Sequence, residues 1–233
     1  MAFLLDIEGT TTPIDFVHKV LFPYARNRMA GYVEEHFEEI GPEILALESE
    51  AAKDNSGGVY REEFRMNSPG SVSDYLKFLI DNDRKSTPLK SIQGMIWKKG
   101  YESGDLVSQV YADVPAAFRA WREEGDSINI YSSGSALAQV LLFRHTDHGD
   151  LTGFIDNYFD TNIGHKKERN SYAEIASRLD VDPSGIVFVS DVDAELDAAT
   201  AAGMRTYLSI REGNPDQENA GGHQTVRSLE EIV

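Results

Sequence analysis

The sequence has 233 residues, of which 41% are hydrophobic, and this length and composition predict a globular protein with one large domain carrying an insertion, or two small domains. Its formal net charge of −17 argues against nucleic acid as a partner, because binding a phosphate backbone requires clustered Lys and Arg. The absence of cysteine excludes disulfides, thiolate metal sites and cysteine nucleophiles.

The N-terminus has no basic region before its apolar residues, and no apolar stretch approaches the roughly 18 residues of a membrane span. We therefore expect no membrane association and a cytoplasmic location, and we expect the chain to act as a monomer. The acidic composition is explained most simply by solubility, and adaptation to a salt-rich cytoplasm is the alternative.

The first predicted element is a buried strand, Phe3-Leu4-Leu5, which runs directly into two carboxylates and a turn of glycine and threonine. Asp6 and Glu8 are two residues apart, so they would share one face of an extended strand. Burying two anions together is costly unless a cation joins them. No Lys or Arg is adjacent, and Mg²⁺ prefers oxygen ligands, so the pattern predicts a magnesium site.

Residues 16–104 show helical periodicity and no strand pattern, which predicts one all-helical insertion. Pro23 requires a kink or a fresh start between the first two apolar stripes, and Pro42 and Pro88 are typical of helix starts. The predicted helices cover 16–24, 25–37, 42–51, 72–80 and 87–100.

From Val114 onward, helices and strands alternate, which indicates a Rossmann-like α/β fold with a parallel sheet flanked by helices. The predicted domains are therefore a core of residues 1–15 and 105–233 and a helical cap of residues 16–104. The polar segment 213–223 is predicted to be a mobile loop before a short terminal helix over 228–232. Predicted strands cover 128–131, 154–159, 186–189 and 206–210, with helices over 114–125, 136–143, 168–179 and 194–202.

Ligands of parallel sheets bind beyond the carboxyl ends of the strands, and the later strands are followed there by Ser132, Ser133, Lys166 and Asp191. Hydroxyls at a helix start bind phosphate, and a lysine contacts both carboxylate and phosphate oxygens. The simpler alternatives are a turn and helix cap for the serines, a solvated surface lysine, and a helix cap for Asp191.

Taken in this order, an acid pair, a serine, a lysine and a final acid resemble the four motifs of the haloacid dehalogenase superfamily of phosphotransferases. The runs 6–14, 130–135 and 164–166 more specifically resemble the enolase-phosphatases of methionine salvage, since Glu8 stands where most superfamily phosphatases have aspartate. The similarity extends over nearly the whole chain apart from residues 38–70.

This resemblance implies that Asp6 attacks phosphorus to form an aspartyl phosphate, and that Glu8 acts as general acid and then as base. It implies Mg²⁺ as the cofactor, a small phosphorylated diketone as the substrate, and a cap that excludes water from the site. Glu8 is also our candidate for the base of the enolisation step. The implied metal-binding residues are Asp6, Asp191 and Glu8 through its carbonyl, and the implied phosphate-binding residues are Ser132, Ser133 and Lys166.

Two alternatives remain at this point. The first is another magnesium-dependent small-molecule phosphatase of the same superfamily. The second is a catalytically silent binding module that keeps the fold, against which the presence of Asp6, Glu8, Lys166 and Asp191 argues.

Overall fold

The computed structural model describes residues 1–215 and 221–232. The chain forms two compact units: unit 1 comprises Met1–Val17 and Val107–Val233, and unit 2 comprises His18–Leu106. Within the described ranges, no helix combines the length and apolar composition that a bilayer span requires.

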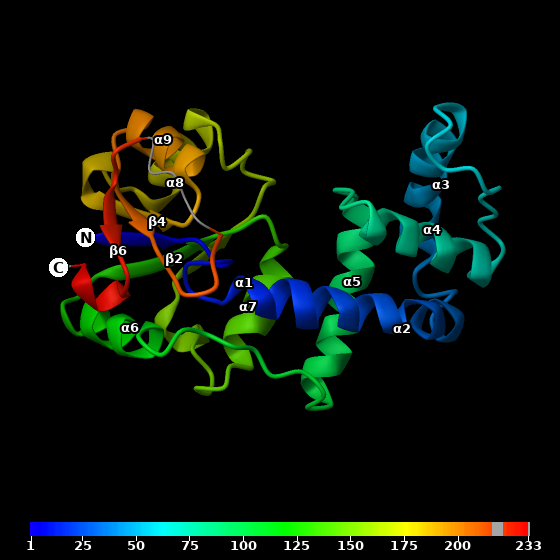
Figure 1. The fold of residues 1–233 in the computed structure, drawn as a ribbon, viewed down its shortest axis with the longest axis horizontal. Coiled ribbons are helices and arrows are strands. Elements are labelled where there is room, and N and C mark those ends of the chain that lie inside the picture. The colour runs from blue at the N-terminus through cyan, green and yellow to red at the C-terminus, as the bar shows by residue number, and fades with distance from the viewer. Residues whose placement is uncertain (216–220, 233) are drawn as a thin grey trace. The chain divides into compact units, whose positions relative to one another are not determined.

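Unit 1 is built on a six-stranded parallel sheet in the order β3-β2-β1-β4-β5-β6 (Figure 1). This confirms the predicted Rossmann-like class. The first strand lies in the middle of the sheet between β2 and β4, so the residues that follow it are surrounded by the ends of its neighbours. The strands are β1 (Ala2–Leu5), β2 (Ser127–Tyr131), β3 (Asn157–Phe159), β4 (Ile186–Ser190), β5 (Arg205–Ser209) and β6 (Gln224–Val226).

Helices cover both faces of this sheet, with α8 and α9 on one side and α6 and α7 on the other (Figure 1). Every residue of β1 and β4 is buried, as expected for strands covered on two sides. Leu4 belongs to the core cluster formed with α8 and α9, whereas Phe3 stacks on Trp121 of α6 with ring centroids 3.7 Å apart. The helices are α6 (Val114–Glu123), α7 (Ala136–Arg144), α8 (Arg169–Leu179) and α9 (Asp193–Ala201).

The C-terminal part of the sheet differs from the sequence-based prediction. The strand β6 was not predicted, because its three residues, Gln-Thr-Val, bury only the valine and carry no apolar run. The predicted helix over 228–232 is a single 3₁₀ turn, Leu229–Glu231, closed by a capping box between Ser228 and Glu231. Residues 216–220 of the predicted mobile loop lie outside the described residues.

In its described residues, unit 2 contains helices and no strand. Pro23 lies at the start of α2 and so marks a fresh start, and a π-helical turn, Val17–Leu21, precedes it. Ser68 and Ser86 cap the next-to-last and last helices of the unit. That unit 2 acts as a cap remains a prediction. Its helices are α2 (Phe22–Glu35), α3 (Gly41–Ser56), α4 (Pro69–Asp81) and α5 (Thr87–Glu102), and the short α1 (Ile14–Phe16) belongs to unit 1.

Candidate active site

Asp6 is the first residue after β1 and is held in place by the sheet itself. Its amide still donates to the Val189 carbonyl of β4 at 3.0 Å, and its Oδ1 accepts from the Ile7 amide at 2.8 Å. The side chain is buried, with 5% of the residue exposed. A carboxylate in this position is oriented before any ligand arrives, which favours a reacting group over a solvated one.

A tight turn follows and carries Glu8. The Ile7 carbonyl accepts the amides of Thr10, Thr11 and Thr12 at 3.2, 3.0 and 2.9 Å, and Gly9 has a positive φ of 70°. A Cβ on Gly9 would collide with Oδ2 of Asp191, so glycine is required by both conformation and space. The turn therefore brings the β1 exit against the β4 exit, and it leaves Glu8 partly buried.

Lys166 is the positive centre of the site. Its Nζ lies 2.6 Å from Oδ1 of Asp6 and 2.6 Å from Oε2 of Glu195, and the residue is 9% exposed. The alternative of a solvated surface lysine is therefore wrong. Burial lowers the pKa of the ammonium group, but Asp6 and Glu195 outweigh burial, so the net pKa is raised and Lys166 stays charged.

Main-chain contacts fix the segment that carries this lysine. The hydroxyl of Tyr172 donates to the Lys166 carbonyl at 2.6 Å, and that of Tyr131 donates to the Gly164 carbonyl at 2.9 Å. Ser171 donates to the His165 carbonyl at 2.7 Å. Three consecutive carbonyls, 164 to 166, are thus satisfied by buried side chains of β2 and α8, which fixes the lysine although the lysine itself lies outside any strand.

The sequence did not single out Glu195 or Ser190 as members of this cluster. The Ser190 hydroxyl lies 3.0 Å from Oε2 of Glu195 and 3.3 Å from Oδ2 of Asp6, and it accepts the Val192 amide. Glu195 lies in the first turn of α9, where an acid is ordinarily explained by the helix dipole. Burial, followed by the charge of Asp6, raises the pKa of Glu195.

Asp191 follows β4 and is buried beside the same cluster. It does not cap α9, whose N-cap is Val192 with no side-chain cap bond, so the helix-cap alternative is wrong. Burial and then the charge of Asp6 raise the pKa of Asp191 to about 7. Ionising this carboxyl is therefore costly unless a positive charge lies beside it.

The donor set fits a hard divalent cation. When ionised, the three carboxylates of Asp6, Asp191 and Glu195 against one ammonium of Lys166 give a net charge of −2. In the part of the chain that the structure describes, no three His, Asp or Glu side chains form a complete metal site. Magnesium does not require one, since it commonly takes one or two carboxylates and fills its remaining positions with water and substrate phosphate.

Ser132 lies at the exit of β2 and is buried. Its amide donates to the Phe159 carbonyl of β3 at 3.1 Å, and its hydroxyl accepts the Gly134 amide at 3.3 Å. Ser132 thus forms a turn, whereas the cap of α7 is Ser135, not Ser132 or Ser133. Phosphate binding by Ser132 and Ser133 remains a prediction.

The comparisons with known proteins agree with this arrangement. Residues 1–203 match the model of the haloacid dehalogenase-like hydrolases. Enolase-phosphatase E1 of Synechococcus elongatus is 46% identical over 240 residues, covering 98% of this chain and 96% of the relative. Enolase-phosphatase E1 of Sorangium cellulosum is 48% identical over 212 residues, covering 91% of this chain and 88% of that one.

Solved structures show the same fold. The UTR4 protein of Saccharomyces cerevisiae superimposes with a TM-score of 0.80 at 32% identity, covering 97% of each chain. A dehalogenase superimposes with a TM-score of 0.55 at 18% identity over 99% of this chain and 94% of that one, which is a likeness of fold alone.

Proposed function

Because the chain belongs to the haloacid dehalogenase-like hydrolases and, within them, to the enolase-phosphatases, we propose that it converts a phosphorylated methylthio diketone through its enol to an acireductone and inorganic phosphate. This is a step of methionine salvage. The observation that carries the chemistry is the buried pair of Asp6 and Lys166 at the carboxyl end of the central strand.

Asp6 is the nucleophile in this proposal. Its carboxylate oxygen forms a bond to phosphorus while the bond from phosphorus to the substrate oxygen breaks, and the electron pair leaves on that oxygen. Lys166 and the Ile7 amide hold Oδ1, so the carboxylate is fixed in one orientation. Lys166 also carries the positive charge that, with Ser132 and Ser133, would bind the transferring phosphoryl group.

Glu8 is the general acid and base in this proposal. It gives a proton to the leaving oxygen in the first step, then takes one from the water that attacks the aspartyl phosphate, which releases phosphate and restores Asp6. Before phosphoryl transfer, the same carboxylate in its ionised form would remove a proton from the carbon beside the substrate ketone, the electron pair would move to the ketone oxygen, and the proton would be returned there to give the enol. Glu8 would then take up a proton from solvent before it acts as general acid. Its extra methylene relative to aspartate extends its reach toward a different position, and we propose that this reach serves the diketone.

Magnesium is the proposed cofactor, held by the carboxylates of Asp6 and Asp191 and by the backbone carbonyl of Glu8. When bound, it neutralises the phosphate oxygens and acidifies the C–H beside a coordinated ketone. The support for it is geometric: Asp6 and Asp191 are buried beside each other at the exits of β1 and β4, and their oxygens are the ligands that Mg²⁺ prefers. The cap role of residues 16–104, the monomeric state and the cytoplasmic location remain predictions.

The order of the two reactions provides the test. After the diketone phosphate is mixed with the protein and Mg²⁺, we expect ultraviolet absorbance of the enol to rise before inorganic phosphate appears. Stopped-flow absorbance and a phosphate sensor record the two signals, and a sample without Mg²⁺ is the control. Phosphate release with no preceding enol signal would favour a different small-molecule phosphatase of the same superfamily.

A further inference from the structure

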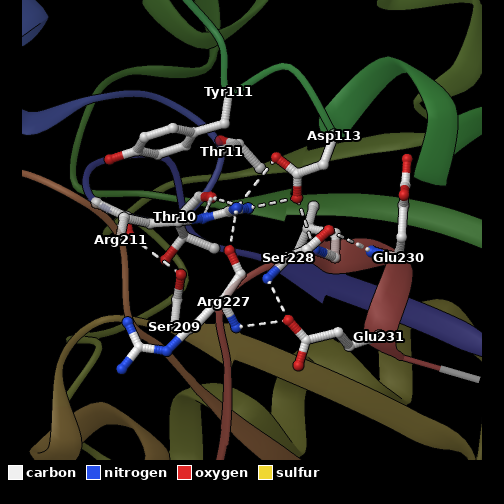
Figure 2. A network of polar contacts seen from close by, with 12 residues as sticks. Thr10, Thr11, Tyr111, Asp113, Ser209, Arg211, Arg227, Ser228, Glu230 and Glu231 are labelled. Carbon is white, nitrogen blue, oxygen red and sulfur yellow. Dashed lines mark hydrogen bonds and ion pairs between the residues drawn. The ribbon is translucent and has the colours of Figure 1, made fainter.

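Two main-chain carbonyls of the turn after Glu8 accept hydrogen bonds from side chains at the end of β5 and in the segment that follows it. The Gly9 carbonyl accepts from Oγ of Ser209 at 3.2 Å and from Nδ2 of Asn214 at 2.9 Å. The Thr10 carbonyl accepts from Nε and Nη2 of Arg211 at 3.1 and 3.0 Å (Figure 2). We call the side chains of Ser209, Arg211 and Asn214 the carbonyl clamp.

Arg211 is anchored on its other side. Its Nη1 donates to Oδ1 of Asp113 at 3.0 Å and to the Arg227 carbonyl at 2.8 Å, and its Nη2 lies 2.9 Å from Oδ2 of Asp113 (Figure 2). Asp113 also accepts the Leu229 amide at 2.6 Å. The Arg211 side chain is 5% exposed, and its two-point ion pair with Asp113 holds the planar guanidinium in one orientation. The clamp is therefore rigid where it meets the turn.

The inner side of the turn is closed by its own bonds. The Ile7 carbonyl takes three amides, and the hydroxyl of Thr11 donates to the carbonyls of Asp6 and Ile7 at 3.1 and 3.3 Å. The outward carbonyls of Gly9 and Thr10 require external donors, which the clamp supplies. These carbonyls belong to the two residues that follow Glu8, so the clamp fixes the main chain from which the Glu8 side chain projects.

Asp6 does not depend on the clamp. It is held by Val189 of β4, by Lys166 and by Ser190, none of which touches the clamp in the described contacts. The only link from the clamp to the acidic cluster among the described residues is a contact of 3.5 Å between Nδ2 of Asn214 and Oδ2 of Asp191. Two separate supports thus hold two carboxylates only two residues apart.

From this separation we infer that the carbonyl clamp is a positioning device for Glu8, an inference that rests on the proposed function. At saturating Mg²⁺, which compensates for a weakened contact between the Glu8 carbonyl and the metal, loss of the clamp leaves attack by Asp6 on phosphorus intact but displaces the carboxylate of Glu8 from the proton it transfers. A displacement of about 1 Å costs on the order of 100-fold in rate. Steps that need Glu8 therefore slow, and steps that need only Asp6 do not.

Two variants test this. Ser209→Ala combined with Asn214→Ala removes both donors to the Gly9 carbonyl while changing no charge. It also removes the 3.5 Å contact between Asn214 and Asp191, which the second variant leaves in place. Arg211→Lys keeps a positive charge opposite Asp113 but loses the fork that holds Thr10. Asn157→Ala is the matched control. Asn157 begins β3, the strand at the opposite edge of the sheet, and its side-chain amide donates to Oδ1 of Asn129 in β2.

An aryl phosphate with a good leaving group separates the steps, since its departure needs no general acid. For both clamp variants we expect an undiminished burst of aryl alcohol, one per active site, followed by steady-state turnover about 10- to 100-fold slower than in the wild type. With the diketone phosphate, appearance of the enol should slow by a similar factor. The control should show wild-type values in each assay.

A double-mutant cycle decides whether the clamp acts through Glu8. In a Glu8→Gln background, the clamp variants should cause no further loss. Losses that multiply in that background, or a burst that falls together with turnover, would overturn the proposal. Wild-type protein that releases no phosphate from either substrate with Mg²⁺ would instead count against the proposed function, so the two failures are distinct.

Discussion

Asp6→Asn should abolish phosphate release, with a loss of about 10⁴- to 10⁶-fold, the scale seen when a covalent nucleophile is removed. The amide cannot form the acyl phosphate, although it has nearly the shape of the carboxylate. We expect the fold to persist, because Lys166 keeps its ion pair with Glu195 at 2.6 Å and the main-chain bond to Val189 is unaffected.

The measurement is phosphate release at saturating Mg²⁺, with circular dichroism to confirm folding. Asp182→Asn is the matched control, because Asp182 is an exposed aspartate of unit 1 that caps a 3₁₀ turn by accepting the Ser184 amide. It should keep wild-type activity. Full activity in Asp6→Asn would disprove the assignment of the nucleophile.

Lys166→Met should be the most destabilising change in the site, by about 3 to 5 kcal/mol at neutral pH. Methionine fills most of the space, but it leaves Asp6, Glu195 and Asp191 buried together without a positive charge. Lys167→Met is the control, since the neighbouring lysine is exposed and should change stability little. Denaturant unfolding of both variants measures the difference.

The loss in Lys166→Met should depend on pH and on metal. The folded-state pKa values of Asp191 and Glu195 are already raised, and removing Lys166 removes an influence that lowers both. A raised carboxyl pKa means that the folded state binds more protons, so stability falls as pH rises from the unfolded pKa, about 4, to the folded one. The variant should therefore be least stable above pH 7 and recover toward pH 5 or with added Mg²⁺. Equal stability at pH 5 and pH 8 would contradict this explanation.

The sequence predicted the parts of the site that lie at strand ends. A buried apolar run followed by an acid identified both Asp6 and Asp191, because parallel strands deliver the residues after them to one edge of the sheet. The same reasoning predicted the Rossmann-like sheet. Lys166 was less certain from the residues alone, since its place depends on the contacts of Tyr131 and Tyr172, which no local pattern reveals.

Other parts of the site depend on tertiary contacts that sequence patterns do not encode. In the sequence, Glu195 is an acid in the first turn of a predicted helix, a common position for an acid. Its ion pair with Lys166 depends on how α9 packs in the fold. Asn214 lies in a polar segment whose composition predicts a mobile loop. Its side-chain amide nevertheless donates to the carbonyl of Gly9, 205 residues away in the chain. The strand β6 was missed for a related reason: its partner β5, not its own composition, makes it a strand.

The most direct test of the division of labour between Asp6 and Glu8 is to trap the covalent intermediate. Glu8→Gln protein, given an aryl phosphate and Mg²⁺ and then quenched in acid, should carry a phosphoryl group on Asp6, because the attack needs no proton transfer but the hydrolysis does. Mass spectrometry of the N-terminal peptide locates the group. A phosphoryl group found on another residue, or aryl alcohol released at the wild-type steady-state rate without any phosphorylated protein, would contradict the account.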